Sequence, residues 1–406
     1  MFLTGKPFQQ GSLKIIAGPV SSGKTEKVEA YLDSLVDSGF KRDSNIVVVR
    51  HPSDDKHPEN LGRHHTAVVS TADDLYSRIK MHTGTVIIMG ASHFEDKNIV
   101  DLADALVRSN RQVVLSGLNL TSEGKPYGFM PQFMALANEV ELAKGICATA
   151  DCYNDNANRS RIARNEFLAA CAHHYSNPDL PLLAAGKEGS LELFVGSMYS
   201  GKSTQWFREL KRVQKAGIKP IVFKWSQDDR YGEMTTERFQ EGNVTLHRGE
   251  KVPAITIAQG EDIREYLAEF PEKKEIFIDE GQFIGGLYQV IFDLIPKGYS
   301  FSVTGLQRGF NRKSFGDIPA LMCLADTINM NYALCVECGH PAPENQRMKR
   351  VNGGDPIPAH YNDPLQAVGG KDTGTVDYFY QARCLKDWVL DGEPKNRYEL
   401  NRFEWE

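Results

Sequence analysis

The chain has 406 residues, of which 41% are hydrophobic and 25% charged, and its formal net charge is −6. This length suggests two or three domains of ordinary globular composition, and the acidic balance gives no general basic surface for nucleic acid. No apolar run approaches membrane-spanning length and residues 1–14 lack the apolar core of a signal peptide, so we expect neither feature.

The first predicted element is an apolar strand over 13–17, followed by G-P-V-S-S-G-K-T and a helical pattern that extends to residue 36. The spacing G-x-x-x-x-G-K-[ST] between a strand and a helix is that of a phosphate-binding loop. We interpret this loop as vestigial; its defining residues are Gly18, Gly23, Lys24 and Thr25.

A second loop of the same pattern lies between a predicted strand over 191–195 and a predicted helix over 203–216. Its glycines would let backbone N–H groups surround a phosphate, and the helix N-terminus adds positive potential. Lys202 would reach the β- and γ-phosphates, while the Ser203 hydroxyl would bind Mg²⁺. The predicted ATP-binding residues are Gly196, Ser197, Met198, Tyr199, Ser200, Gly201, Lys202, Ser203 and Thr204.

The stretch I-F-I-D-E-G-Q-F predicts a buried strand that ends in Asp279 and Glu280. A carboxylate at the end of a parallel strand would lie beside the phosphate loop, where Asp279 suits Mg²⁺. Glu280 faces another way and could accept a proton from an attacking hydroxyl. The alternative is that both carboxylates only cap a turn, which the nearby phosphate loop disfavours.

The two loops belong to an internal repeat. Gly117-Leu118 recurs as Gly305-Leu306 at an offset of 188, and Cys152 recurs as Cys338 at an offset of 186. We call residues 11–177 copy one and residues 190–390 copy two. The predicted domains are 1–177, a linker over 178–189, and 190–406, the last divided into a core to 334, a metal-binding and lid subdomain over 335–390, and a tail over 391–406.

Each copy alternates apolar runs with helical patterns, which predicts an α/β domain with a mostly parallel sheet. In copy two the predicted strands cover 191–195, 220–224, 275–279, 301–304 and 327–334. The predicted helices cover 203–216, 262–270, 286–296 and 317–324.

The copies differ where chemistry is expected. Opposite Asp279-Glu280, copy one has Gly90-Ala91 and therefore no carboxylate, which predicts a non-catalytic copy. Copy two also carries 27 extra residues, because Cys171 and Cys384 are offset by 213 whereas Cys152 and Cys338 are offset by 186. The stretch 347–383 is rich in Gly, Pro, Asn and Asp, and we expect it to form a long functional loop.

Seven cysteines in a chain this long do not indicate a disulfide scaffold, and their clusters late in each copy point to metal in a reducing compartment. Copy two has C-x-x-C followed by C-x-x-D, with His340 as a competing fourth ligand. Buried free cysteines are the alternative to structural zinc. The predicted zinc ligands are Cys335, Cys338, Cys384 and Asp387 in copy two, and Cys147, Cys152, Cys171 and His174 in copy one.

Together these motifs resemble the thymidine kinase family of the zinc-containing, two-domain type. The resemblance covers nearly all of copy two through G-S-M-Y-S-G-K-S-T, K-W-S-Q-D-D-R-Y, I-D-E-G-Q-F, G-L-Q-R-G-F-N-R-K-S-F-G and C-V-E-C-G-H. Copy one resembles the same family in decayed form. The resemblance implies a P-loop NTPase (RecA-like) fold with a small zinc subdomain that carries a lid, or lasso, loop.

The resemblance also implies an activity: phosphorylation of the thymidine, or deoxyuridine, 5′-hydroxyl by ATP and Mg²⁺ in pyrimidine deoxynucleotide salvage. Glu280 would be the general base, with Arg230 and Lys202 holding the phosphoryl charge. The implied nucleoside-binding residues are Met198, Asp228, Phe283, Leu306, Phe310, Phe315, Val368, Gly369, Gly370 and Tyr380.

The implied partners are small molecules, with dTTP as feedback inhibitor and neither nucleic acid nor membrane. Members of this family assemble as tetramers of single domains, so a homodimer of this chain would form a pseudo-tetramer. The implied compartment is the cytoplasm, or the host cytoplasm for a viral chain. An ATP-driven motor and a nucleotide-binding regulator without turnover are the rival functions; the acidic charge and the single Asp-Glu pair argue against the motor.

Overall fold

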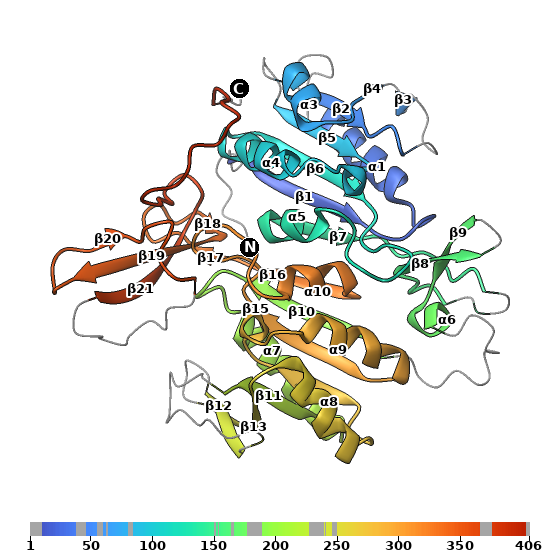
Figure 1. Cartoon of the computed structure of the whole chain (residues 1–406), viewed down its shortest axis with the longest axis vertical. Helices are drawn as coiled ribbons and strands as arrows, with labels where there is room; N and C mark the ends of the chain where they lie inside the picture. Colours follow the sequence, from blue (N-terminus) through green and yellow to red (C-terminus); the bar gives the residue numbers. More distant parts are fainter. Residues whose placement is uncertain are drawn as a thin grey trace.

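The computed structural model of the chain describes residues 10–37, 46–54, 60–61, 64–79, 84–149, 152, 154–163, 166–176, 189–226, 239, 241–245, 250–365 and 376–402. These residues form two α/β domains that lie side by side, each built around its own sheet (Figure 1). Among them, no helix has the length and apolar content needed to cross a bilayer.

Copy one has a seven-stranded sheet of order β3-β4-β2-β5-β6-β1-β7, in which only the β3–β4 pair is antiparallel. Its central strand β5 is buried along its whole length, as expected for a largely apolar strand in the middle of a parallel sheet. The strands are β1 (Ser12–Ala17), β2 (Ile46–Arg50), β3 (Asn60–Leu61), β4 (His64–Val68), β5 (Thr85–Met89), β6 (Gln112–Gly117) and β7 (Glu139–Leu142). The helices are α1 (Lys24–Asp37), α3 (Ala72–Ile79), the 3₁₀ turn η1 (Ala91–His93), α4 (Asn98–Arg108), α5 (Met130–Leu136) and α6 (Ala172–Ser176).

Copy two repeats this topology as β12-β13-β11-β14-β15-β10-β16, again with one antiparallel pair, β12–β13, at the edge. The strands are β10 (Leu191–Gly196), β11 (Ile221–Trp225), β12 (Glu241–Thr245), β13 (Lys251–Ile257), β14 (Glu275–Ile278), β15 (Ser300–Gly305) and β16 (Thr327–Asn331). The helices are α7 (Lys202–Lys215), α8 (Gly260–Glu269), η3 (Gly281–Phe283), α9 (Leu287–Leu294), η4 (Ile295–Lys297) and α10 (Ile318–Leu324). The prediction of mostly parallel sheets flanked by helices is therefore confirmed, although β12 and β13 were not predicted.

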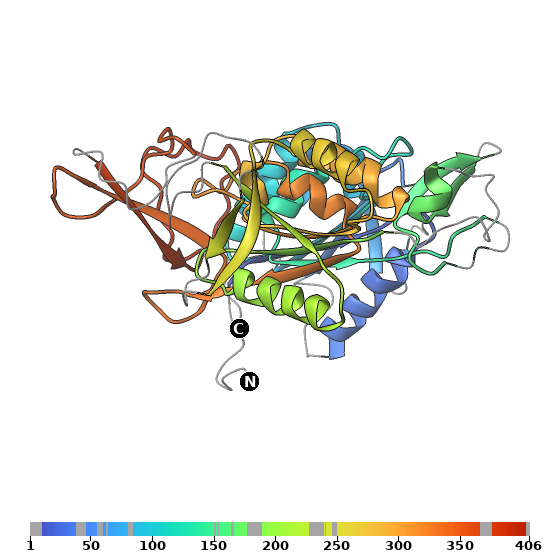
Figure 2. The ribbon, with the colours of Figure 1, turned by 90° about the horizontal axis from the view of Figure 1, so that it is seen from below.

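The stretch 347–383 is a loop only in part, because both of its ends are β-strands. Residues 347–351, 357–358 and 376–383 belong to a three-stranded antiparallel ribbon of order β20-β19-β21, which projects from the domain (Figure 2), and residues 366–375 lie outside the described residues. Polar residues fill β19, so propensity gave no strand signal; its pairing with a partner some thirty residues away stabilises it. The strands of this region are β17 (Ala333–Leu334), β18 (Pro341–Ala342), β19 (Glu344–Val351), β20 (Ile357–Pro358) and β21 (Val376–Arg383). Copy one has only the short hairpin β8 (Arg159–Ala163) and β9 (Glu166–Ala170) in its place.

The copies are joined by a continuous interface. Helix α5 packs on α10, edge strand β7 lies against β16, and one hydrophobic core cluster contains residues of both copies. The chain after β21 then crosses onto copy one, where Tyr398 is buried and donates a hydrogen bond to Asp73 (2.8 Å). Tyr76 of α3 donates to the Glu399 carbonyl in the same place (2.9 Å). The tail of copy two is thus part of the packing of copy one.

Candidate active site

The phosphate loop of copy two connects the end of β10 to the start of α7. Gly196 has φ 149°, and a Cβ there would lie 2.1 Å from the Asn331 carbonyl oxygen, so only glycine fits. The Met198 amide donates to Asn345 Oδ1 (2.7 Å), which ties the loop to β19. Lys202 is buried at the helix start, and Ser203 follows it in the first turn. Tyr199, at φ 64°, is 60% exposed, so its side chain points away from the core.

Asp279 and Glu280 follow β14, at the same carboxyl edge of the parallel sheet as the phosphate loop. Both side chains are buried, and the Asp279 amide donates to the Phe223 carbonyl (3.0 Å). Glu280 adopts φ 52° and ψ 45°, a left-handed conformation that is rare for a residue with a side chain. The structure therefore places two buried carboxylates where the sequence predicted them.

Gln282 orients Glu280. Its Nε2 donates to Glu280 Oε2 (2.5 Å), while its Oε1 accepts a hydrogen bond from the Leu306 amide (3.1 Å). Our sequence reasoning did not single out Gln282, although it lies within the I-D-E-G-Q-F motif. The amide group fixes the carboxylate and links it to the loop that follows β15.

Aromatic rings surround this edge of the sheet. Phe283 stacks on Trp225 (centroids 4.7 Å apart, 17° between planes) and meets Phe315 edge-on (5.3 Å, 89°). Leu306 and Phe310, which lie close to Phe315 in the sequence, are also buried. We did not predict Trp225 as a site residue, because a Trp at the end of a strand is expected to be a core residue when its ring contacts are not known.

Arg347, in β19, joins the ribbon to Phe310. It is fully buried, and its guanidinium lies 3.8 Å from the Phe310 ring centroid and 4.8 Å from that of Tyr378. Its Nη1 also donates to the Tyr380 hydroxyl (3.4 Å). Arg347 therefore brings Phe310 and Tyr380 together, and no local motif in the sequence marks it. The other predicted residues Arg230, Asp228, Val368, Gly369 and Gly370 lie outside the described residues.

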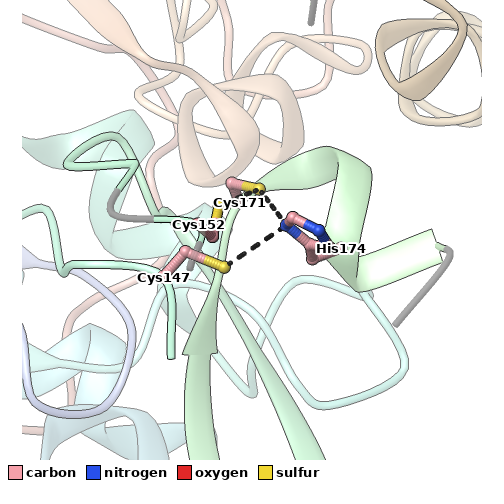
Figure 3. A group of neighbouring side chains, drawn as sticks. All are labelled: Cys147, Cys152, Cys171 and His174. Atoms are coloured by element: carbon pink, nitrogen blue, oxygen red, sulfur yellow. Dashed lines mark hydrogen bonds between the residues drawn. The ribbon is translucent and has the colours of Figure 1, made fainter. Parts of the chain in front are cut away.

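Each copy has a four-residue cluster that could hold a metal ion. Ligand atoms of Cys147, Cys152, Cys171 and His174 lie within 4.8 Å of one another (Figure 3), as do those of Cys335, Cys338, Cys384 and Asp387. Three thiols with one imidazole or carboxylate match a closed tetrahedral zinc site.

In copy two, Asp387 Oδ2 lies 3.3 Å from Cys335 Sγ and 3.2 Å from Cys384 Sγ. His340 Nδ1 lies 3.3 Å from Cys338 Sγ, at the exposed side of the cluster. The geometry favours Asp387 as the fourth ligand, because it contacts two of the three thiols.

Copy one has no carboxylates at the positions that correspond to Asp279 and Glu280. The structure also shifts by one residue the correspondence that we predicted from the sequence. His51, His93 and Tyr127 form the counterpart of the aromatic group, with His93 stacked on His51 (5.9 Å) and edge-on to Tyr127 (5.3 Å). His93 then matches Phe283, so Met89-Gly90, not Gly90-Ala91, stands opposite Asp279-Glu280. Neither residue carries a charge.

Side chains of the phosphate loop of copy one bond to the backbone of the same loop. Lys24 Nζ donates to the Pro19 carbonyl (2.5 Å), and the Ser22 hydroxyl donates to the same oxygen (2.9 Å). The Asp54 side chain occupies the space beside Gly90, where an added Cβ would lie 2.9 Å from the Asp54 Cβ. Copy one therefore keeps the loop while another side chain fills the place of Glu280.

A phosphate loop and a buried Asp-Glu pair at the carboxyl edge of a mostly parallel sheet place copy two in the P-loop class of nucleotide-binding proteins. The family model described as thymidine kinase matches residues 11–175 and again residues 189–388. The chain therefore belongs to the thymidine kinase family and is a nucleoside kinase. Its two consecutive matches agree with a tandem arrangement.

Proposed function

We propose that copy two transfers the γ-phosphoryl group of ATP to the 5′-hydroxyl of thymidine, with deoxyuridine as a second acceptor. The observation that carries this proposal is the buried Glu280, held by Gln282 beside the stacked Trp225–Phe283 pair. A stacked aromatic wall suits a pyrimidine base, and a fixed carboxylate within the same site suits a hydroxyl nucleophile.

In the proposed reaction, Glu280 takes the proton of the 5′-hydroxyl while that oxygen forms a bond to the γ-phosphorus. The bond from the γ-phosphorus to the bridging oxygen breaks, and ADP leaves with the electron pair. Lys202 neutralises charge on the phosphates, and the N-terminus of α7 adds to this field. Arg230 supplies a further charge by family resemblance.

Ser203 and Asp279 are the residues that would hold Mg²⁺, since one hydroxyl and one buried carboxylate offer the hard oxygen donors it prefers. Bound there, the ion would neutralise the phosphate oxygens. The zinc clusters would be structural, joining the ribbon to the core. We also propose that copy one is non-catalytic, that dTTP inhibits copy two, and that the enzyme works in the cytoplasm.

The test is to incubate the chain with ATP, Mg²⁺ and a panel of nucleosides, and to look for monophosphates by chromatography. We expect thymidine monophosphate, and no product from purine nucleosides. ATP hydrolysis stimulated by DNA but not by thymidine would instead indicate a motor. ATP binding without turnover on any nucleoside would indicate a regulator.

A further inference from the structure

A buried cluster of charges crosses the interface between the copies. Arg312, on the loop between β15 and α10, directs Nε and Nη2 to Oδ1 of Asp104 (3.2 and 2.6 Å), on α4 of copy one. Its Nη1 contacts Glu344, the first residue of β19. Arg312 is 5% exposed, and the Asp104 side chain 16%. A carboxylate of copy one thus balances a buried guanidinium of copy two.

The pKa values agree with a charged pair. Burial alone would raise the pKa of the Asp104 carboxyl, but Arg312 and Arg108 outweigh burial and hold that pKa below its usual value. Burial would also lower the pKa of Arg312, yet Asp104 and Glu344 raise it. Both groups are therefore ionised at neutral pH.

The loop that carries Arg312 also carries Phe310 and Phe315. Trp388 Nε1 donates to the Phe310 carbonyl (3.2 Å), and the Trp388 ring lies under the guanidinium groups of Arg108 (5.0 Å) and Arg312 (5.9 Å). Side chains of both copies therefore contact this loop.

The same cluster reaches the phosphate loop. Arg308 Nε pairs with Glu344 Oε2 (3.1 Å), and Arg308 Nη1 donates to the Leu136 carbonyl of copy one (2.7 Å). Asn345 Nδ2 donates to the Arg308 carbonyl (3.2 Å), while its Oδ1 accepts from the Met198 amide. A continuous series of polar contacts thus joins copy one to both parts of the site.

The related contact on the other side of the interface is built differently, because the guanidinium of buried Arg159 there lies over the Phe292 ring (4.8 Å). Gly124 is the counterpart of Arg312 at the repeat offset of 188, and both have positive φ (77° and 61°). It faces Phe292, the counterpart of Asp104, and an added Cβ at Gly124 would lie 2.2 Å from Phe292 Cζ. Two copies of the catalytic domain joined through this face would set Arg312 against Phe292 and leave it without the Asp104 carboxylate. The Asp104–Arg312 ion pair is therefore specific to the pairing of copy one with copy two.

We propose that Asp104 of copy one is a positioning residue for the nucleoside site of copy two. It holds Arg312, and through Arg312 it fixes the loop that presents Phe310 and Phe315. Copy one would thus have kept a role in catalysis after it lost its own carboxylates. This inference rests on the nucleoside kinase function proposed above.

The test compares full-length wild type, Asp104→Asn and a matched control, Asp73→Asn. Asp73 is also a carboxylate of copy one that bonds to copy two, through Arg397 (3.0 Å) and Tyr398, but it does not contact the Arg312 loop. We expect Asp104→Asn to raise the thymidine KM about tenfold, with kcat and the ATP KM changed less than about twofold. Asp73→Asn should leave all three near wild type. In an Arg312→Met background, Asp104→Asn should have no further effect on the thymidine KM, because Arg312, the residue through which Asp104 acts on the loop, is absent; the remaining partner of Asp104 is Arg108 of copy one (2.6 Å).

Hydrogen exchange of residues 305–316 gives a readout that does not need activity. The amide of Arg312 bonds to the Gly309 carbonyl and that of Phe315 to the Gln307 carbonyl, and both should exchange faster in Asp104→Asn. If Asp104→Asn does not fold, Arg312→Lys should show the same changes, since it loses the forked contact.

Unchanged KM and exchange in Asp104→Asn, or an equal effect of Asp73→Asn, would overturn the positioning role. A wild type that phosphorylates no nucleoside would refute the proposed function. In that case faster exchange in Asp104→Asn would still support the structural part of the inference.

Discussion

Glu280 in copy two and Gly90 in copy one occupy equivalent positions in the same turn. The turn needs a left-handed residue, with φ 52° at Glu280 and 69° at Gly90. A non-glycine residue in this region costs about 1–3 kcal/mol, whereas glycine adopts it freely. Copy two keeps the strained residue, which is expected where the carboxylate has a function.

Replacing Glu280 by Gln should lower kcat for thymidine phosphorylation at least about 100-fold, because the amide cannot accept the proton. The shape is unchanged, and the Gln oxygen can still accept the bond from Gln282, so ATP affinity should remain. Initial rates and a titration with a fluorescent ATP analogue measure the two quantities. A kcat within tenfold of wild type would show that another group is the base.

The Lys24 side chain of copy one has a lowered pKa. Burial lowers the pKa of its ammonium from 10.5 to about 8, only partly offset by Asp54 and Glu26. Between these two pH values the unfolded chain holds a proton that the folded chain lacks, so this group makes unfolding less favourable as pH rises. Over this range the free energy of unfolding rises by at most about 3 kcal/mol, because one pKa unit corresponds to about 1.4 kcal/mol.

The variant Lys24→Met removes this titration. We expect the variant to have a larger free energy of unfolding than wild type at pH 7.5. The difference between the two should be smaller at pH 10. Urea unfolding at both pH values measures it. Thymidine turnover should be near wild type if copy one is non-catalytic, as we propose. A folded variant without turnover would contradict that division of labour.

At the scale of elements, the parts that could be predicted are those with a local signal. The buried strands β10 and β14, the helices that follow them, and the loop and carboxylates they carry lie within short motifs. The ribbon could not be predicted, because β19 is polar and stabilised by pairing with β21 across residues without a pattern. Gln282, Trp225 and Arg347 became site residues only through contacts with distant side chains.

Each metal cluster brings together residues from separate parts of its copy. We expect two zinc ions per chain by elemental analysis, and one ion in either Cys171→Ser or Cys384→Ser. Only Cys384→Ser should lose thymidine turnover, because Cys384 directly follows β21, which carries Tyr380. Freshly purified wild type without zinc would rule out both sites. Equal loss of turnover in the two variants would show that the cluster of copy one also supports the active site.

At the scale of the whole molecule, copy one covers surface that copy two cannot expose alone. Helix α10 is buried at every one of Ile318, Pro319, Leu321, Met322, Cys323 and Leu324, and α5 supplies part of that cover. Without copy one, this apolar helix would face water and Arg312 would lose Asp104. This packing predicts that the two copies fold as one unit.

We therefore expect the full chain, of 45.4 kDa, to form a homodimer of twice that mass, which would be a pseudo-tetramer with two active sites. The resemblance to the thymidine kinase family implies tetramers of single domains, and the contact between the two copies would supply one of the pairs in such an assembly. Light scattering under native conditions measures the mass, and the fragment 190–406 is the comparison. The fragment should aggregate or lose turnover, because its α10 face has no partner. A monomeric full chain, together with a fragment of full activity, would show that copy one is needed for neither assembly nor catalysis.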